Sequence, residues 1–394
     1  MAKAVKTIGV LTSGGDAPGM NAAIRAVVRT AINKGLKVKG IMRGYAGLLE
    51  EEIVDMESTS VSDIINRGGT ILYTARCKEF TTAEGQQKGA DICRKHGIDG
   101  MVVIGGDGSF RGAGKLSSLG INTIGLPGTI DLDIACTDYT IGFDTAVNTA
   151  MEAIDKIRDT STSHERCSIV EVMGRNAGWL TGAAALAKGE DCLGPDLIYL
   201  PELPFDIEAF SEKVKDLLAK KPSVVVAVSE GIRLADGRYV CELGQSVDFV
   251  DAFGHKQLSG TANYLASYIA GEFGCKTRAI ELSTLQRSAS HCASRVDILE
   301  AYQVGGAAVK AADEGDSGKM VVLQRLSDDP YQCGTEVKDV HKIANDEKVV
   351  PREWVTEDGS YVTDDFVSYV RPLIQGDVSP VMVDGIPRHL YRKN

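Results

Sequence analysis

Two short acidic motifs have the residue types that phosphoryl transfer requires. The first, GGDGS at 105–109, follows the apolar run Met101–Ile104 and precedes an expected helix over Gly112–Leu119. Its glycines would let backbone N–H groups approach phosphate oxygens, and the helix N-terminus adds positive potential. Asp107 would bind Mg²⁺ together with phosphates. The motif predicts a phosphate and Mg²⁺ site; the alternative is a tight turn with Asp107 as a helix N-cap.

The second motif, PGTIDLD at 127–133, places two carboxylates two residues apart after the next apolar run. In an extended backbone Asp131 and Asp133 point to the same side. One could then accept a proton while the other stays near the metal. Phosphoryl transfer to a hydroxyl needs such a base, with cations around the transferring group. The alternative is a solvated acidic turn.

Several arginines lie at or near the ends of expected strands, where they could bind phosphate. The planar guanidinium group can donate to two phosphate oxygens at once. A single arginine of this kind is usually a solvated surface residue, so the repeated position is what favours binding. Glu230 follows another apolar run and is expected either to accept a hydrogen bond from a sugar hydroxyl or to cap a turn. The arginines are Arg166, Arg175, Arg278 and Arg287.

Continuous apolar runs alternate with amphipathic segments along most of the chain. This pattern predicts an α/β fold with mostly parallel, buried sheets and helices on both faces. Ligands of such folds bind at the carboxyl ends of the strands, where both acidic motifs lie. Expected helices include Asn21–Asn33, Phe143–Arg158 and Ile207–Leu218, the last with Asp206 as its N-cap. The expected strands are Ile8–Leu11, Val38–Met42, Met101–Ile104, Thr123–Leu126, Ile169–Val172, Val224–Val228, Ala279–Leu282 and Met320–Leu323.

The overall composition excludes several classes of partner. The 394 residues carry a net charge of −11, which argues against nonspecific nucleic-acid or anionic-membrane binding. Nine cysteines form no CxxC pair, so free thiols in a reducing compartment are expected. The apolar run near the N-terminus is too short to span a membrane and has no cleavage pattern, which predicts a cytoplasmic protein.

Five motifs in a fixed order resemble the 6-phosphofructokinase family of the bacterial type. They are TSGGDAPGMN at 12–21, NRGGT at 66–70, GGDGS at 105–109, PGTID at 127–131 and VMGR at 172–175. The resemblance covers about residues 8–306. It implies two Rossmann-like lobes with the active site in the cleft between them. It also implies a homotetramer or homodimer with shared sites, which transfers the γ-phosphoryl group of ATP to the 1-hydroxyl of fructose 6-phosphate in glycolysis.

The resemblance also assigns domains and residue roles. Residues 1–140 would form a nucleotide-binding lobe and residues 141–300 a fructose 6-phosphate-binding lobe. Residues 301–349 would return to the first lobe, and residues 350–394 would be a C-terminal extension on the surface. ATP would contact Gly15, Arg76, Cys77, Gly106, Asp107, Gly108 and Ser109, with Mg²⁺ on Asp107. Asp131 would be the general base beside Thr129, and Arg76 and Arg175 would stabilise the transferring group. Fructose 6-phosphate would contact Thr129, Asp131, Met173, Gly174, Arg175, Glu230, Thr284 and Arg287, with Arg166 and Arg278 reaching it from a neighbouring subunit.

The chain departs from the family pattern at three places. Leu132 replaces the usual Asn of TIDND, and TLQRSA at 284–289 replaces HIQRGG, so that Thr284 stands where a histidine is usual. At the effector site Arg25, Arg29, Arg158 and Lys221 match basic residues, whereas Ser58, Ala219 and Ser223 do not. These uncharged residues predict weak allosteric control.

Three other functions compete with this hypothesis. A pyrophosphate-dependent enzyme would usually have Asp at the position of Gly108 and Lys at that of Gly128. The two glycines are expected to leave room for the rest of ATP. A weakly catalytic regulatory subunit would be consistent with Leu132 and Thr284 but not with intact Asp131. An NAD or lipid kinase would share GGDG without PGTID or MGR. A Walker A motif and a GxGxxG motif are both absent.

Overall fold

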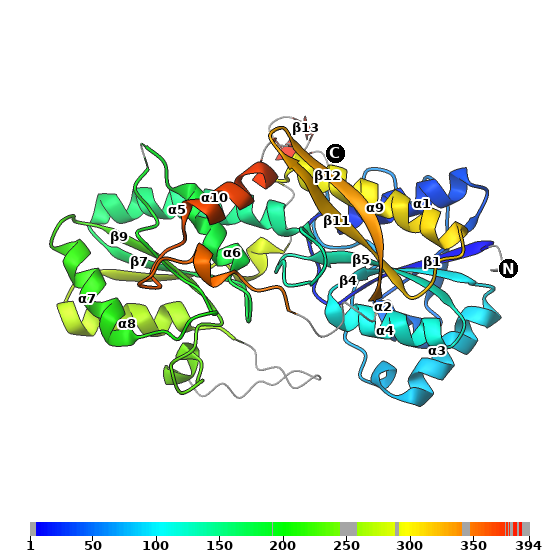
Figure 1. Cartoon of the computed structure of the whole chain (residues 1–394), viewed down its shortest axis with the longest axis horizontal. Helices are drawn as coiled ribbons and strands as arrows, with labels where there is room; N and C mark the ends of the chain where they lie inside the picture. The colour runs from blue at the N-terminus through cyan, green and yellow to red at the C-terminus, as the bar shows by residue number, and fades with distance from the viewer. Residues whose placement is uncertain are drawn as a thin grey trace.

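The chain folds into two lobes that lie side by side (Figure 1). The computed structural model describes residues 5–190, 192–244, 258–287, 291–340, 347–374, 376, 378, 381–383 and 386–387. Each lobe has a sheet of mostly parallel strands with helices on both faces, as expected from the continuous apolar runs. No helix in these ranges is both long and apolar enough to cross a membrane.

The first lobe contains the larger sheet, with strand order β12-β11-β5-β4-β1-β2-β3 and β6 paired to β5. Only β3 and β12 run antiparallel to their neighbours. All seven residues of β1 are buried, which explains the apolar run at its centre, Ile8–Leu11. The strands are β1 (Thr7–Ser13), β2 (Lys37–Ile41), β3 (Ile53–Met56), β4 (Gly100–Gly105), β5 (Asn122–Thr129), β6 (Ile141–Gly142), β11 (Lys319–Asp328) and β12 (Tyr331–Asp339).

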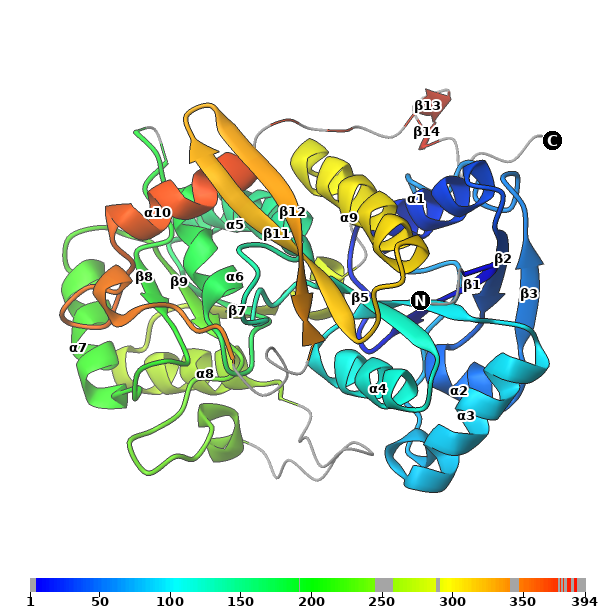
Figure 2. The same cartoon turned by 45° about the vertical axis from the view of Figure 1, so that its right-hand side comes forward.

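Helices cover the two faces of this sheet in separate groups (Figure 2). α1 (Met20–Asn33) packs beside α9 (Arg295–Asp313) on one face. The buried side chains of α1 recur at helical spacing, as in Ala23, Val27 and Ala31, so one stripe of the helix enters the core. The opposite face carries α2 (Gly44–Leu49), α3 (Ala83–Lys95) and α4 (Asp107–Ser118), with the short 3₁₀ helix η1 (Glu79–Thr81) beside them.

The second lobe is built on a four-stranded parallel sheet in the order β10-β7-β9-β8. α7 has the bounds expected from the sequence, and Asp206 accepts a hydrogen bond from the Ala209 amide at 2.9 Å, as an N-cap should. The elements are β7 (Cys167–Val172), β8 (Leu197–Tyr199), β9 (Val224–Ser229), β10 (Thr277–Glu281), α5 (Phe143–His164), α6 (Trp179–Gly182), α7 (Ile207–Leu218), α8 (Thr261–Phe273), η2 (Ala183–Ala187), η3 (Val240–Leu243) and η4 (Ser283–Gln286).

The C-terminal segment corrects one expectation. Residues 350–374 are more than a surface segment, because Val350, Val362 and Phe366 are buried in the core beside the second lobe while polar residues such as Arg352 and Asp364 stay exposed. Trp179 packs against Phe366 at 5.9 Å and against Trp354 at 6.0 Å between ring centres. The segment therefore completes the apolar core. It contains η6 (Arg352–Trp354), α10 (Asp364–Val370) and η7 (Arg371–Ile374), followed by the hairpin β13 (Met382–Val383) and β14 (Ile386–Pro387).

Candidate active site

Three neighbouring strands of the first lobe end at the same edge of the sheet. β4 lies between β1 and β5, and Gly105 is in register with Ser13 on one side and with Pro127 on the other. Two Gly-Gly-Asp sequences, at residues 14–16 and 105–107, therefore lie beside the PGTID motif. This is the carboxyl edge, where ligands of parallel sheets bind.

The GGDGS motif forms the first turn of α4 rather than a loop before it. The helix begins at Asp107 with Gly106 as its N-cap, so the expected start at Gly112 is wrong and Asp107 is not the cap. A Cβ added at Gly106 or Gly108 would meet nothing within 4 Å. There is therefore open space beside the first turn of α4, next to the helix N-terminus where an anion could bind. Ser109 is buried, and its carbonyl accepts a hydrogen bond from Tyr45 Oη at 2.7 Å.

Asp107 has a partner that the sequence analysis did not identify. Its carboxylate pairs with Arg111 at 2.9 Å, one helical turn further on. The spacing of four residues was the available signal, because such pairs face each other on a helix. Among the described residues no three His, Cys, Asp or Glu side chains are placed to hold a metal ion. A metal at Asp107 would therefore need phosphate oxygens as further ligands, which is the way Mg²⁺ is usually bound with nucleotides.

The backbone between Asp131 and Asp133 is not extended, so this expectation is wrong. Leu132 has φ +55°, in the left-handed region that asparagine adopts more readily than leucine. The leucine side chain is fully buried. Thr129 Oγ1 accepts from the Asp131 amide at 3.2 Å and lies 3.5 Å from Asp131 Oδ2, so the two predicted site residues are in contact.

The two aspartates sit in a strongly acidic environment. Burial raises the pKa of Asp133 to about 7, and the nearby charges of Asp131, Glu347 and Asp107 add to the rise. Like charges at short range make it costly to ionise both aspartates, so Asp133 binds a proton near neutral pH, next to Asp131. Glu347, more than two hundred residues away in sequence, was not predicted.

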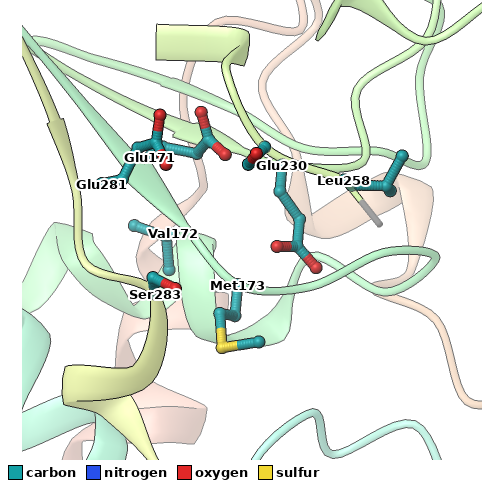
Figure 3. A pocket seen from close by; sticks show the side chains of 8 residues that line it. Glu171, Val172, Met173, Glu230, Leu258, Glu281 and Ser283 are labelled. Atoms are coloured by element: carbon teal, nitrogen blue, oxygen red, sulfur yellow. The ribbon is translucent and has the colours of Figure 1, made fainter. Parts of the chain in front are cut away.

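A pocket in the second lobe, here called the acidic pocket, has three glutamates among its eight lining residues (Figure 3). Glu230 and Met173, both predicted site residues, line it together, and their side chains lie close to one another. Burial raises the pKa of Glu230 to about 7, and the nearby charges of Asp131 and Glu171 add smaller increases. The effect of the Asp131 charge on Glu230 shows that this pocket lies near the aspartate pair that follows β5 of the other lobe. The lining residues are Glu171, Val172, Met173, Glu230, Leu258, Ser259, Glu281 and Ser283.

Glu171 is a pocket residue that the sequence analysis missed. Its carboxylate accepts a hydrogen bond from the Ala262 amide at 2.8 Å, at the N-terminus of α8. Burial nevertheless raises its pKa to about 7. A charged residue inside the continuous apolar strand β7 was the available signal. Glu281 also lines the pocket and is held by Asn263 Nδ2 at 2.6 Å.

The VMGR motif forms a tight turn after β7. Gly174 has φ +140°, and a Cβ there would lie 2.6 Å from the Ala177 carbonyl oxygen, so glycine is required. Its carbonyl accepts a hydrogen bond from Ser229 Oγ. The Met173 amide donates to Gln286 Oε1 at 3.0 Å, which joins this turn to the loop that carries Arg287. The backbone of Arg175 packs so closely on Gly231 that a Cβ at 231 would lie 1.9 Å from its carbonyl oxygen.

Arg287 brings the two lobes together. Its Nη1 donates to the Asp16 carbonyl at 3.4 Å, and a Cβ at Gly15 would lie 2.4 Å from the same nitrogen. The predicted sugar-phosphate arginine therefore lies over the predicted nucleotide loop. Thr284 and Arg76 are exposed, and Cys77 packs against the core beside α2 and α3. The departures at Ser288 and Ala289 lie outside the described residues.

Arg166 and Arg278 lie at the amino ends of strands in the second sheet, away from the pocket at the carboxyl ends. They mark the amino ends of β7 and β10, where Ser168 is in register with Arg278. The pocket lies at the carboxyl ends, three residues or about 10 Å further along β10 at Glu281. The structure therefore does not bring these two arginines to the pocket of their own chain.

Gly128 does not leave the room for ATP that was expected from the sequence. A Cβ there would lie 2.9 Å from Ile104 and 3.3 Å from Met20, both in the core. Ile104 and Met20 fill the space beside Gly128, so no room is left there for a nucleotide. The space beside Gly108, by contrast, is open. Tight packing in the core, rather than the cleft, accounts for glycine at this position.

Comparisons with known proteins agree with this arrangement. A family model described as phosphofructokinase matches residues 7–312. An ATP-dependent 6-phosphofructokinase of Thermoanaerobacter sp. (strain X514) is 53% identical over 283 residues, 71% of this chain and 86% of that protein. One of Clostridium botulinum (strain Hall) is 49% identical over 321 residues, 81% and 90% of the two chains. The solved structure of a pyrophosphate-dependent phosphofructokinase from Marinobacter aquaeolei has a TM-score of 0.86 and 29% identity, and covers 98% of this chain and 95% of that one. The chain belongs to the phosphofructokinase family.

Proposed function

We propose that this protein transfers the γ-phosphoryl group of ATP to the 1-hydroxyl of D-fructose 6-phosphate, giving fructose 1,6-bisphosphate and ADP. The observation that carries the proposal is the meeting of Asp107 and the Asp131–Asp133 pair after the neighbouring strands β4 and β5. A helix N-terminus that can bind phosphate, beside a carboxylate that can take a proton, is suited to phosphoryl transfer to a hydroxyl. A coupled assay of ADP formation with fructose 6-phosphate tests the proposal. A chain that binds both substrates without turnover would instead be a regulatory subunit.

The nucleotide would bind at the N-terminus of α4. Backbone groups of Gly106 and Gly108 would contact its phosphates, with Ser109 beside them, because the space next to both glycines is open. Asp107 would exchange Arg111 for Mg²⁺, which when bound neutralises charge on the β- and γ-phosphates. Gly15, Arg76 and Cys77 would complete the nucleotide site.

The sugar phosphate would lie between the acidic pocket and the catalytic aspartates. Asp131 would take the proton from the 1-hydroxyl, held by its contact with Thr129. Glu230 and the backbone of Met173 and Gly174 would orient the sugar. Arginine charge would offset the growing negative charge on the transferring group. We assign this charge to Arg76 and Arg175. Arg287 and the uncharged Thr284 would contact the sugar phosphate.

A homo-oligomer with shared sites would explain where Arg166 and Arg278 lie. Both are too far from the pocket of their own chain, at the amino ends of β7 and β10. Mixing Arg278→Ala chains with Asp131→Asn chains should therefore restore activity, because some hybrid sites would combine an intact Asp131 with an intact Arg278. The measurement is turnover after co-refolding differently tagged chains and isolating hybrids.

The control for this experiment is a mixture of each variant with itself. Activity that does not rise in isolated hybrids would mean that Arg278 serves the site of its own subunit. A rise seen equally in the self-mixtures would reflect refolding rather than complementation.

Allosteric control should be weak. Arg158 pairs with Asp159 at 2.8 Å and with Asp155 at 3.2 Å, and Lys221 pairs with Asp196, so two of the matching basic residues are already neutralised. We expect ADP and phosphoenolpyruvate to change the half-saturating fructose 6-phosphate concentration by less than about threefold, since an effector phosphate needs several charge-assisted bonds. Saturation curves with and without each effector measure this. A steep, effector-sensitive sigmoid would contradict it.

A pyrophosphate donor is the second candidate. The Marinobacter aquaeolei structure supports it, since the likeness extends over nearly the whole chain, including the C-terminal segment. The higher identity to ATP-dependent relatives and the open space at Gly108 favour ATP.

A further inference from the structure

Residues 347–350, here called the strap, pair with the loop that carries the catalytic aspartates. This catalytic loop comprises residues 130–138. The Lys348 amide donates to the Asp133 carbonyl at 2.9 Å, and Glu347 forms an antiparallel bridge with Ile134. The strap thus continues the catalytic loop as a short strand pair.

The side chain of Lys348 holds the far end of the same loop. Its ammonium group donates to the carbonyls of Thr137 at 3.1 Å and Asp138 at 2.5 Å. It also lies 3.3 Å from Tyr369 Oη and 4.9 Å from the centre of the Trp179 ring. Burial lowers the pKa of Lys348 to about 8. Burying a cation disfavours folding unless its bonds offset the cost, so stability alone is a weak reason for a lysine here.

The other side of the strap is fixed to the second lobe. Trp179 Nε1 donates to the Lys348 carbonyl at 2.8 Å, and Asn176 Nδ2 donates to Glu347 Oε1 at 2.6 Å. Glu202 Oε1 accepts from the amides of both Gly178 and Val350, at 2.7 and 2.9 Å. The strap therefore joins the turn after VMGR to the catalytic loop.

The catalytic loop has a backbone that needs such support. Leu132 has φ +55° and Cys136 has φ +65°, conformations that cost energy for residues with a side chain. They persist only where the surroundings hold them. The Lys348 amide binds the carbonyl of Asp133, the residue after Leu132. Its ammonium group binds the carbonyls of Thr137 and Asp138, the two residues after Cys136.

We propose that Lys348 is a positioning residue for phosphoryl transfer, because its hydrogen bonds to Asp133, Thr137 and Asp138 hold the catalytic loop so that Asp131 faces the acceptor hydroxyl. The inference rests on the proposed function. It gives the C-terminal segment a role in catalysis, in addition to its place in the core. It also ties the aspartates of the first lobe to the VMGR turn of the second.

The test is Lys348→Met, which keeps the stem between Trp179 and Tyr369 and removes the donor. We expect kcat to fall about 10–100-fold, because a shift of about 1 Å in a catalytic group costs rate on this scale. The KM values for ATP and fructose 6-phosphate should stay within about twofold. A kcat within twofold of the parent, in protein with parent-like circular dichroism, overturns the proposal.

A double variant separates positioning from general damage. If Lys348 acts through Asp131, then Asp131→Asn with Lys348→Met should be about as slow as Asp131→Asn alone, since groups acting as a unit are non-additive. Independent losses that multiply would overturn the proposal. If Asp131→Asn itself stays active, the proposed function of the site fails instead, which is a different outcome.

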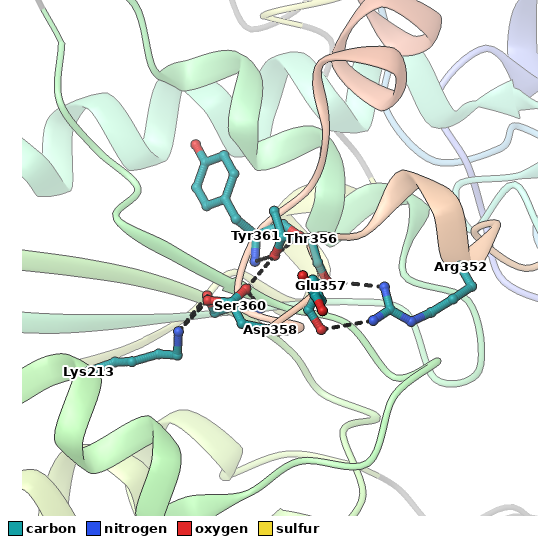
Figure 4. Close-up of polar contacts among 7 residues, drawn as sticks. All are labelled: Lys213, Arg352, Thr356, Glu357, Asp358, Ser360 and Tyr361. Carbon is teal, nitrogen blue, oxygen red and sulfur yellow. Dashed lines mark hydrogen bonds and ion pairs between the residues drawn. The ribbon is translucent and has the colours of Figure 1, made fainter.

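Lys213→Met is the matched control. Lys213 (α7) donates to Asp358 and to Ser360 at 3.2 Å, so it ties the turn of residues 356–361 to the second lobe (Figure 4). Arg352 bonds the Glu357 carbonyl in the same turn at 2.9 Å. Loosening this tie should leave kcat unchanged.

If Lys348→Met does not fold, the variant Tyr369→Phe tests the proposal instead. It removes only the hydroxyl that contacts Lys348 Nζ and the Asp138 carbonyl, and we expect kcat to fall about threefold or more at unchanged KM. Parent-like kcat in that variant overturns the proposal.

Discussion

Replacing Asp131 with asparagine should lower kcat by about 10²–10⁴-fold, the range typical for loss of a general base. The amide keeps the shape of the carboxylate and can still contact Thr129, so the fold and both KM values should change little. Steady-state turnover with ATP and fructose 6-phosphate, alongside a thermal melt, measures both effects. Glu208→Gln, an exposed carboxylate in the first turn of α7, is the matched control and should behave as the parent. Near-parent turnover of Asp131→Asn would show that another group accepts the proton.

The pH dependence of kcat gives a second measure of the same site. Burial and the charge of Asp131 raise the pKa of Asp133 to about 7, so Asp133 takes up a proton as the pH falls through this value. The negative charge beside the proposed base Asp131 is then lost, which weakens the attraction for the proton that leaves the acceptor hydroxyl, and the activity of the parent should therefore fall below about pH 7. In Asp131→Asn the charge at 131 is lost, so the pKa of Asp133 should drop. The residual activity should then persist to lower pH than in the parent.

Local signals in the sequence predicted much of the framework. All eight expected strands are present, and most of them, such as β1, β4, β7 and β9, are buried parallel strands, which are apolar runs whatever their neighbours are. The bounds of α7 followed from Asp206 and an amphipathic stripe within twelve residues. The start of α4 was misplaced, because Gly106 and Gly108 resemble a turn when only propensity is considered.

The parts that could not be predicted depend on contacts between distant residues. The left-handed Leu132 follows from contacts such as that between the Lys348 amide and the Asp133 carbonyl, which join segments far apart in the chain. The raised pKa of Asp133 depends in part on Glu347 for the same reason. Most of the C-terminal segment is irregular, and its short helix, α10, buries only Phe366 and Val370, too few residues for a clear period. Periodicity cannot detect such packing.

ATP should be the better phosphoryl donor, and Gly108→Asp should remove most of that preference. Gly108 lies in the first turn of α4, where a Cβ would meet nothing within 4 Å, so an aspartate fits without disturbing the core. Its carboxylate would stand where the rest of ATP must pass and would repel the α-phosphate. Two unit charges 4 Å apart interact by about 4 kcal/mol near a protein surface, an upper limit before screening by solvent and Mg²⁺. We expect kcat/KM for ATP to fall at least about 10–100-fold.

Gly108→Asn separates charge from bulk in this experiment, because it has the shape of aspartate without its charge. Since the repulsion is electrostatic, the asparagine variant should keep more ATP activity than the aspartate variant, and pyrophosphate turnover should fall less than ATP turnover in both. Each protein is assayed with both donors at saturating fructose 6-phosphate. Equal losses in the two variants would make the effect steric. Turnover of the parent with pyrophosphate that matches or exceeds that with ATP would assign this chain to the pyrophosphate-dependent enzymes, with Gly108 no longer a guide to the donor.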